Sequence, residues 1–210
     1  LSPTGTDMKK LFTTLVLIAA IFVVSFTSNK NRLPVGSMLP MAGDRMPDVS
    51  GALVSFTDAL RPEGLLVMFS SNTCPYVIKN QQRTKEICTY ALQKDIGVIL
   101  INSNEGQREE ADSFTAMQQY AREQGYSWYY VLDKNSVMAD EFDANRTPEC
   151  FLFNAEKKLV YHGAIDDNPI QPAAVKRSHL RLAMDEMLEG KNISVQESRS
   201  AGCAIKRIGD

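Results

Sequence analysis

Cys74 is the residue of this sequence whose surroundings best suit chemistry. It follows the apolar run Leu65 to Phe69, which is typical of a strand buried on both faces. A helical pattern begins directly after it, and Pro75 suits the first helical position, where a missing amide hydrogen costs nothing. The spacing predicts a helix N-cap at Cys74, where unpaired amides and the helix dipole favour the nucleophilic thiolate. The alternative is a buried structural thiol.

The other cysteines differ in their surroundings. On a helix over residues 76–94, Cys88 would lie roughly 21 Å from Cys74, too far for a disulfide. Cys88 shares the apolar side of that helix and Cys150 opens an apolar strand, so we interpret both as core residues. Cys203 lies beyond the last predicted helix, in a segment with few apolar anchors. It could approach Cys74, or it could be a packing or unused tail cysteine.

The elements that must position Cys74 alternate in type. The strand at residues 65–69, the helix at 76–94 and a second apolar strand at 96–101 form one βαβ unit. A helix ending at Gly125, a short strand at 128–132 and a helix over 133–142 follow.

The second half of the chain predicts a hairpin and a closing helix. Cys150 to Phe153 and Lys158 to Gly163 are the hairpin strands, and the amphipathic helix spans about Ala173 to Leu188. This order indicates an α/β fold with a mixed central sheet and helices on both faces. A connection that returns Thr147 and Pro148 beside the end of the first strand would place them near Cys74, where open α/β sheets bind ligands.

Composition bounds the class of protein. The 210 residues are 44% hydrophobic and 23% charged, with a net charge of −2. These values are typical of one globular domain, and the absence of a long basic block argues against nucleic acid as a partner.

The N-terminal residues predict export. Met8, Lys9 and Lys10 precede an uncharged apolar stretch from Leu11 to Phe26, which suits a cleaved signal or an uncleaved membrane anchor better than a buried core helix. We expect residues 1–28 to hold upstream residues and this signal or anchor, 29–44 a linker, 45–190 the domain, and 191–210 a tail with Cys203. The expected location is the bacterial periplasm.

The chain resembles the thioredoxin-like superfamily, and more closely its peroxiredoxin-like redoxin branch, which is related to alkyl hydroperoxide reductase and thiol-specific antioxidant proteins. The resemblance covers roughly residues 45–190. It rests on the strand, Cys74, Pro75 and helix, on the Arg-Thr-Pro-Glu run at 146–149, and on the Tyr-His-Gly-Ala-Ile-Asp-Asp run at 161–167.

The resemblance implies a thioredoxin-like fold and a site built around Cys74. In the superfamily, the proline that matches Pro148 is cis and packs against the reactive cysteine. The residues expected to line the substrate site are Thr73, Pro75, Tyr76, Thr147 and Pro148. The tail around Cys203 resembles an ending of the same branch, which implies a resolving thiol that attacks a Cys74 sulfenic acid or mixed disulfide.

The sequence departs from two motifs of the superfamily. Val77 stands where thioredoxins have a second cysteine, so the usual short disulfide cannot form. In the peroxiredoxin motif, Ser71 matches the hydroxyl position but Val67 replaces the proline. Cys74 must therefore work with a distant or external thiol.

No metal or cofactor site is expected. His162 and His179 are not spaced as metal ligands, and we interpret them as surface or strand-end residues. The acidic run from Asp166 to Asn168 is interpreted as a turn. The expected partners are a thiol or disulfide protein, or a peroxide.

Two hypotheses follow. The leading one is an exported thiol-dependent oxidoreductase, either a thiol-disulfide oxidoreductase or a weak peroxiredoxin-like peroxidase. The alternative is a thioredoxin-fold binding or structural module without catalysis.

Overall fold

The computed structural model describes residues 33–209. The predicted signal or anchor from Leu11 to Phe26 lies outside the described residues. Within residues 33–209, no helix is long and apolar enough to cross a membrane.

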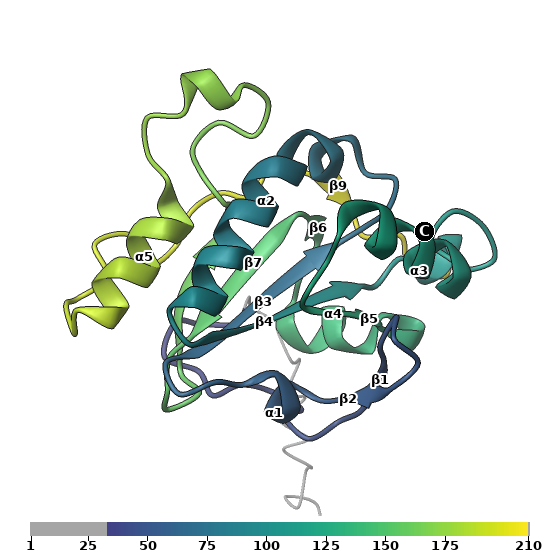
Figure 1. Ribbon diagram of the computed structural model, residues 1–210, viewed down its shortest axis with the longest axis horizontal. Coiled ribbons are helices and arrows are strands. Elements are labelled where there is room, and N and C mark those ends of the chain that lie inside the picture. The colour runs from purple at the N-terminus through teal and green to yellow at the C-terminus, as the bar shows by residue number, and fades with distance from the viewer. Residues whose placement is uncertain (1–32, 210) are drawn as a thin grey trace, which may run out of the picture. The chain divides into compact units, whose positions relative to one another are not determined.

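A five-stranded mixed sheet forms the centre of the molecule (Figure 1). Its strand order is β5-β4-β3-β7-β8. The first three strands of this order are parallel, whereas β7 runs antiparallel to both β3 and β8. The bounds are β3 (Gly64–Ser70), β4 (Ile96–Asn102), β5 (Tyr129–Leu132), β7 (Glu149–Phe153) and β8 (Leu159–Gly163).

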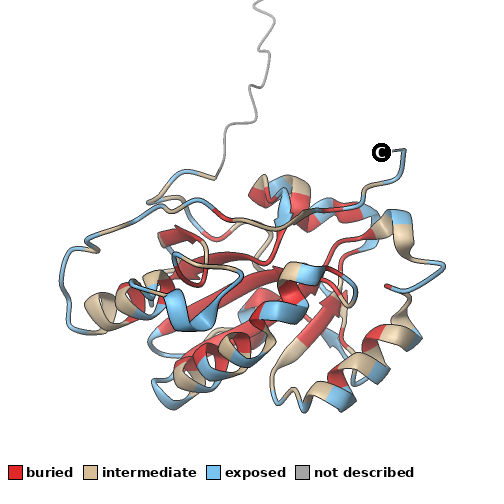
Figure 2. Ribbon diagram, turned by 90° about the horizontal axis from the view of Figure 1, so that it is seen from above, coloured by how far each residue is buried: buried red, intermediate tan, exposed pale blue. Residues whose placement is uncertain are grey.

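Helices cover both faces of the sheet, as the sequence predicts. One face packs against α2 (Pro75–Gln93), α3 (Phe114–Gln124) and α5 (His179–Leu188). The other packs against α1 (Phe56–Ala59) and α4 (Val137–Phe142). Figure 2 shows the buried strands between these helices. The continuous apolar runs of β3 and β4 follow from this arrangement, because every side chain of both strands is buried.

Two predicted helices begin later than their sequence pattern suggested. The helix expected from Ala173 starts at His179, because the Lys176 N–H donates to the Asp167 carboxylate (2.9 Å) and cannot join a helical ladder. The helix expected over residues 133–142 is a 3-10 turn at Lys134–Ser136 followed by α4. There the Asp133 carboxylate accepts from the N–H groups of Met138 and Ala139 in the first turn of α4.

Residues before and after the predicted domain are packed against it. In the expected linker, the Gly36 N–H donates to the Leu159 carbonyl (2.8 Å), and Leu39 is buried. A short ribbon, β1 (Met46–Pro47) with β2 (Leu53–Val54), follows.

The C-terminal tail is held more firmly than its sequence suggested. In the tail, β9 (Cys203–Ala204) pairs antiparallel with β6 (Arg146–Thr147). Ile205 is buried in the core beside α4 and anchors the tail there. Burial of one such side chain stabilises by about 1.5–3 kcal/mol.

Candidate active site

Cys74 lies at the carboxyl end of β3 and is the N-cap residue of α2, with Pro75 at the first helical position. The turn before it is built on Ser71, whose Oγ accepts from the N–H groups of Thr73 (3.1 Å) and Cys74 (3.3 Å). The Ser71 hydroxyl therefore positions the backbone of Cys74. The cysteine itself is only 4% exposed.

Thr147 contacts the Cys74 sulfur from the segment just before β7, the strand next to β3. Because β7 pairs with β3 and aligns Glu149 with Phe69, the residues just before β7 lie at the end of β3. In the thiol form, Cys74 donates to the Thr147 carbonyl, with 3.1 Å from sulfur to oxygen. The Thr147-Pro148 peptide bond is cis, as the resemblance implied.

Cys203 is brought to Cys74 by the pairing of β6 with β9. In this register Cys203 lies opposite Thr147, the residue that contacts the Cys74 sulfur. Cys203 and Cys74 lie close enough that each thiol shifts the pKa of the other. Two cysteines far apart in the sequence therefore share one site.

The two thiols have opposite acid–base character. Burial disfavours the thiolate of Cys74, but donors around the sulfur outweigh burial, so the pKa of Cys74 lies below its ordinary value. These donors are the thiol of Cys203, the hydroxyl of Thr147, and the backbone N–H groups of Val77 and Cys203. Burial and the hydrogen bond to Cys74 raise the pKa of Cys203 to about 11. Cys74 is thus the better nucleophile at neutral pH.

The Thr147 hydroxyl favours this ionisation. It is buried, and among the described residues it has no hydrogen-bond partner. It lies close enough to the sulfur to stabilise the thiolate. A buried hydroxyl without a hydrogen-bond partner destabilises the fold. The Cys74 thiolate would supply an acceptor for it.

The other predicted site residues surround this centre to different degrees. Thr73 and Pro75 are exposed beside Cys74, Tyr76 is partly exposed, and Pro148 is buried. Cys88 and Cys150 are fully buried, and burial raises the pKa of both thiols, as expected for core residues.

His162 is buried, so its interpretation as a surface residue was wrong, although it does lie near the end of β8. Its Nε2 is 2.7 Å from Oε1 of Glu149, and its ring stacks on Phe151. The second Glu149 oxygen accepts from the N–H groups of Asn145 (2.9 Å) and Arg146 (3.1 Å). Glu149 and His162 thereby fix the segment that carries Thr147. Within residues 33–209, no three potential ligand side chains gather around one metal position.

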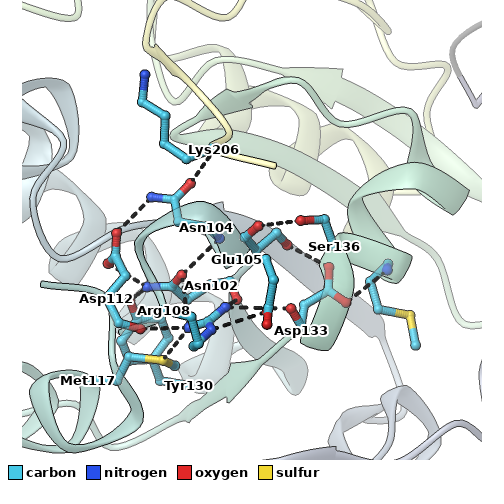
Figure 3. Close-up of polar contacts among 12 residues, drawn as sticks. Asn102, Asn104, Glu105, Arg108, Asp112, Met117, Tyr130, Asp133, Ser136 and Lys206 are labelled. Atoms are coloured by element: carbon cyan, nitrogen blue, oxygen red, sulfur yellow. Dashed lines mark hydrogen bonds and ion pairs between the residues drawn. The ribbon is translucent and has the colours of Figure 1, made fainter. Parts of the chain in front are cut away.

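A buried polar network beside the site was not identified from the sequence (Figure 3). Asp112 is fully buried and accepts from the Asn72 N–H (2.9 Å), from Asn102 Nδ2 (2.7 Å) and from Asn104 Nδ2 (2.8 Å). The signal for it was the Asn-Ser-Asn run at 102–104, which ends a buried strand next to the strand of Cys74.

Comparisons with known proteins agree with this geometry. The Redoxin family model matches residues 35–177. An uncharacterised conserved protein from Geobacillus kaustophilus is 30% identical, with a TM-score of 0.79, and the match covers 86% of this chain and 95% of that one. A hypothetical protein from Sinorhizobium meliloti 1021 is also 30% identical, with a TM-score of 0.77 and coverage of 86% and 98%.

A more distant likeness concerns the fold alone. The structure of PrxQ from Xylella fastidiosa is 12% identical, with a TM-score of 0.57 and coverage of 76% of this chain and 98% of that one. No curated protein matches the sequence.

Proposed function

This chain belongs to the redoxin family, and from that premise we propose that it is an exported thiol-dependent oxidoreductase with Cys74 as nucleophile and Cys203 as resolving thiol. Family membership supports a thiol-disulfide oxidoreductase or a peroxiredoxin-like activity. The observation that supports the finer assignment is the pairing of β9 with β6, which sets Cys203 opposite Thr147, the residue whose carbonyl accepts from the Cys74 thiol.

The first step is attack by the Cys74 thiolate on an electrophile. With a peroxide, sulfur bonds to one oxygen, the O–O bond breaks, and the leaving alkoxide or hydroxide takes a proton from solvent, which leaves Cys74 as a sulfenic acid. With a disulfide substrate, sulfur bonds to one sulfur atom, and the other departs as a thiolate. In both cases Cys74 is oxidised and the substrate is reduced.

The second step is attack by Cys203. Its thiolate bonds to the oxidised Cys74 sulfur and displaces hydroxide, or the remaining substrate thiolate, to give a Cys74–Cys203 disulfide. While Cys74 is a thiolate, the proton stays on Cys203, because the negative sulfur raises the pKa of Cys203. Oxidation removes that charge, so Cys203 ionises more easily at the stage when it must attack. An external dithiol then reduces the disulfide and completes the cycle.

Replacement of Cys74 tests the nucleophile. In the presence of a dithiol reductant, Cys74→Ser should abolish turnover of both hydrogen peroxide and a protein disulfide, because an uncharged hydroxyl cannot replace the thiolate. Cys88→Ala is the matched control, because it removes a thiol that lies in the core away from the site, and it should retain turnover. Comparison of the two substrates in the wild-type protein shows which electrophile Cys74 prefers.

Unchanged turnover in Cys74→Ser would contradict the assignment. Absence of turnover of both substrates in the wild-type protein would favour the alternative, a binding or structural module without catalysis.

Export is part of this proposal, and it is supported by the basic and apolar residues from Met8 to Phe26. Fractionation of bacteria that express the full chain should place it in the periplasm or at the inner membrane. Replacement of Val16 and Leu17 by Asp should retain it in the cytoplasm. Cytoplasmic location of the unaltered chain would contradict export.

A further inference from the structure

We propose that Asn104 is a positioning residue that holds Cys203 against Cys74, an inference that rests on the proposed role of Cys203 as resolving thiol. Asn104 lies two residues after the end of β4 and is buried. Its side chain lies between Lys206 of the tail and Asp112 (Figure 3).

The amide oxygen of Asn104 binds the tail. This oxygen, Oδ1, accepts from the backbone N–H of Lys206 at 2.9 Å, three residues after Cys203. The N–H of Gly106 donates to the Lys206 carbonyl at 2.8 Å, so both backbone groups of that tail residue are held by the 104–106 segment.

The amide nitrogen of Asn104 is linked through Asp112 to the loop of Cys74. Nδ2 of Asn104 donates to Oδ2 of Asp112 at 2.8 Å, while Oδ1 of Asp112 accepts from the N–H of Asn72 at 2.9 Å. One line of hydrogen bonds therefore runs from Lys206, through Asn104 and Asp112, to Asn72. Lys206 lies three residues after Cys203, and Asn72 lies two residues before Cys74. These hydrogen bonds therefore restrain the distance between the two thiols.

This position needs an amide. The side chain must accept from a backbone N–H and donate to a carboxylate at the same time, which Asp, Leu and Ala cannot do. Asp112 keeps its bonds from Asn72 and Asn102 if Asn104 is replaced. A substitution at Asn104 therefore loosens the tail and leaves the loop of Cys74 attached.

The consequence is specific to the resolving step. Attack by Cys203 is intramolecular, and its rate and equilibrium depend on how often the two sulfurs meet in the right geometry. Attack by Cys74 on its substrate forms no bond to the tail, although Cys203 is one of several donors to the Cys74 thiolate. Loss of Asn104 should therefore lower the effective concentration of Cys203 at Cys74 by about tenfold or more, and change the reactivity of the Cys74 thiolate much less.

The test measures the two steps apart in full-length protein. The equilibrium of the Cys74–Cys203 disulfide with glutathione gives the effective concentration, and alkylation of reduced Cys74 by iodoacetamide gives its own reactivity. Asn104→Ala and Asn104→Leu should shift the glutathione equilibrium toward the reduced protein by about tenfold or more, with alkylation of the Cys74 thiolate, measured above its pKa, changed less than about threefold. Asn192→Ala, at an exposed tail position, should change neither.

Gly106→Ala is a second variant that does not depend on the fold of the Asn104 variants. A Cβ there would come within 2.8 Å of the Arg207 carbonyl oxygen, so the tail must move away. It should shift the glutathione equilibrium in the same direction.

If folded Asn104→Ala keeps the wild-type glutathione equilibrium, the role of Asn104 is overturned while that of Cys203 is intact. If the Asn104 variants do not fold, the same result in Gly106→Ala overturns it. An equal loss of Cys74 alkylation and of disulfide stability would also overturn it, because general damage to the site would then explain both. A wild-type protein that forms no Cys74–Cys203 disulfide would overturn the resolving step and this inference together.

Discussion

Cys74 and Cys203 illustrate how neighbouring groups, rather than residue type, give two thiols different roles. The sulfur of Cys74 faces several donors, and its pKa falls although burial opposes ionisation. Cys203 supplies one of these donors, and its own pKa rises as a result. The pair is therefore prepared to react in one order, with Cys74 first.

Removal of the Cys203 thiol should raise the pKa of Cys74. In Cys203→Ala the sulfur loses a donor to its thiolate, which is worth a shift of about two- to tenfold in the ionisation equilibrium. Cys203→Ser keeps a hydroxyl donor and should shift the pKa less. The measurement is the pH midpoint of Cys74 alkylation, because the midpoint, unlike the rate, is insensitive to easier access. The same midpoint in Cys203→Ala and wild type would contradict the stabilising role of Cys203.

Glu149 should contribute stability that depends on pH. Burial opposes its charge, but hydrogen bonds from His162, Asn145 and Arg146 prevail and lower its pKa. Because the folded pKa lies below the unfolded value, the contribution is complete above about pH 4.5 and is lost as the pH falls through the folded pKa. Glu149→Gln should lower the free energy of unfolding by about 1.5–3 kcal/mol at pH 7 and by less at pH 4.

Urea unfolding at the two pH values checks this expectation. Glu156→Gln is the control, since Glu156 pairs with Lys158 at an exposed site and should change stability by less than about 0.5 kcal/mol. Equal losses for the two variants at pH 7 would contradict the importance of the buried pair.

At the scale of elements, the short β9 strand decides whether the two thiols meet. It contributes only two residue pairs to β6, so its neighbours must fix its place. Gly202, just before β9, passes so close to β6 that a Cβ would lie 2.2 Å from the Thr147 carbonyl oxygen. Only glycine permits this approach.

Gly202→Ala should therefore move β9 away from β6. We expect slower formation of the Cys74–Cys203 disulfide and faster alkylation of Cys74, which the tail would no longer cover. Gly43→Ala is the matched control, because no atom lies within 4 Å of its Cβ position. Rapid mixing with peroxide followed by acid quench and mass spectrometry gives both rates. A wild-type rate of disulfide formation in Gly202→Ala would show that β9 does not depend on this close approach.

The elements that the sequence predicted best are those with their own periodic pattern. The runs of β3 and β4 are apolar throughout because both faces are covered, and α2 follows with a proline at its first position. The start of α5 was predicted poorly, because the bonds that Asp167 makes to residues 176 and 177 compete with the helix and leave no periodic trace.

At the scale of the whole molecule, the chain returns its C-terminal tail to the end of β3, where the site lies. The proximity of Thr147 and Cys74 could be predicted, because it follows from the order of strands. The tail's attachment could not, because it depends on tertiary contacts such as the β6–β9 pair, the burial of Ile205 and the hydrogen bond from Lys206 to Asn104. Pairings such as Glu149 with His162 are likewise set by tertiary structure, and single-sequence patterns carry no record of them.

The most direct measurement of the central claim is a peptide map after mild oxidation. Reduced full-length protein is treated with one equivalent of hydrogen peroxide, its remaining thiols are alkylated, and it is digested without reductant for mass spectrometry. The account predicts a peptide pair linked by Cys74 and Cys203 within one chain, with Cys88 and Cys150 unoxidised. Cys74 found as a sulfenic or sulfinic acid, with Cys203 alkylated, would contradict it.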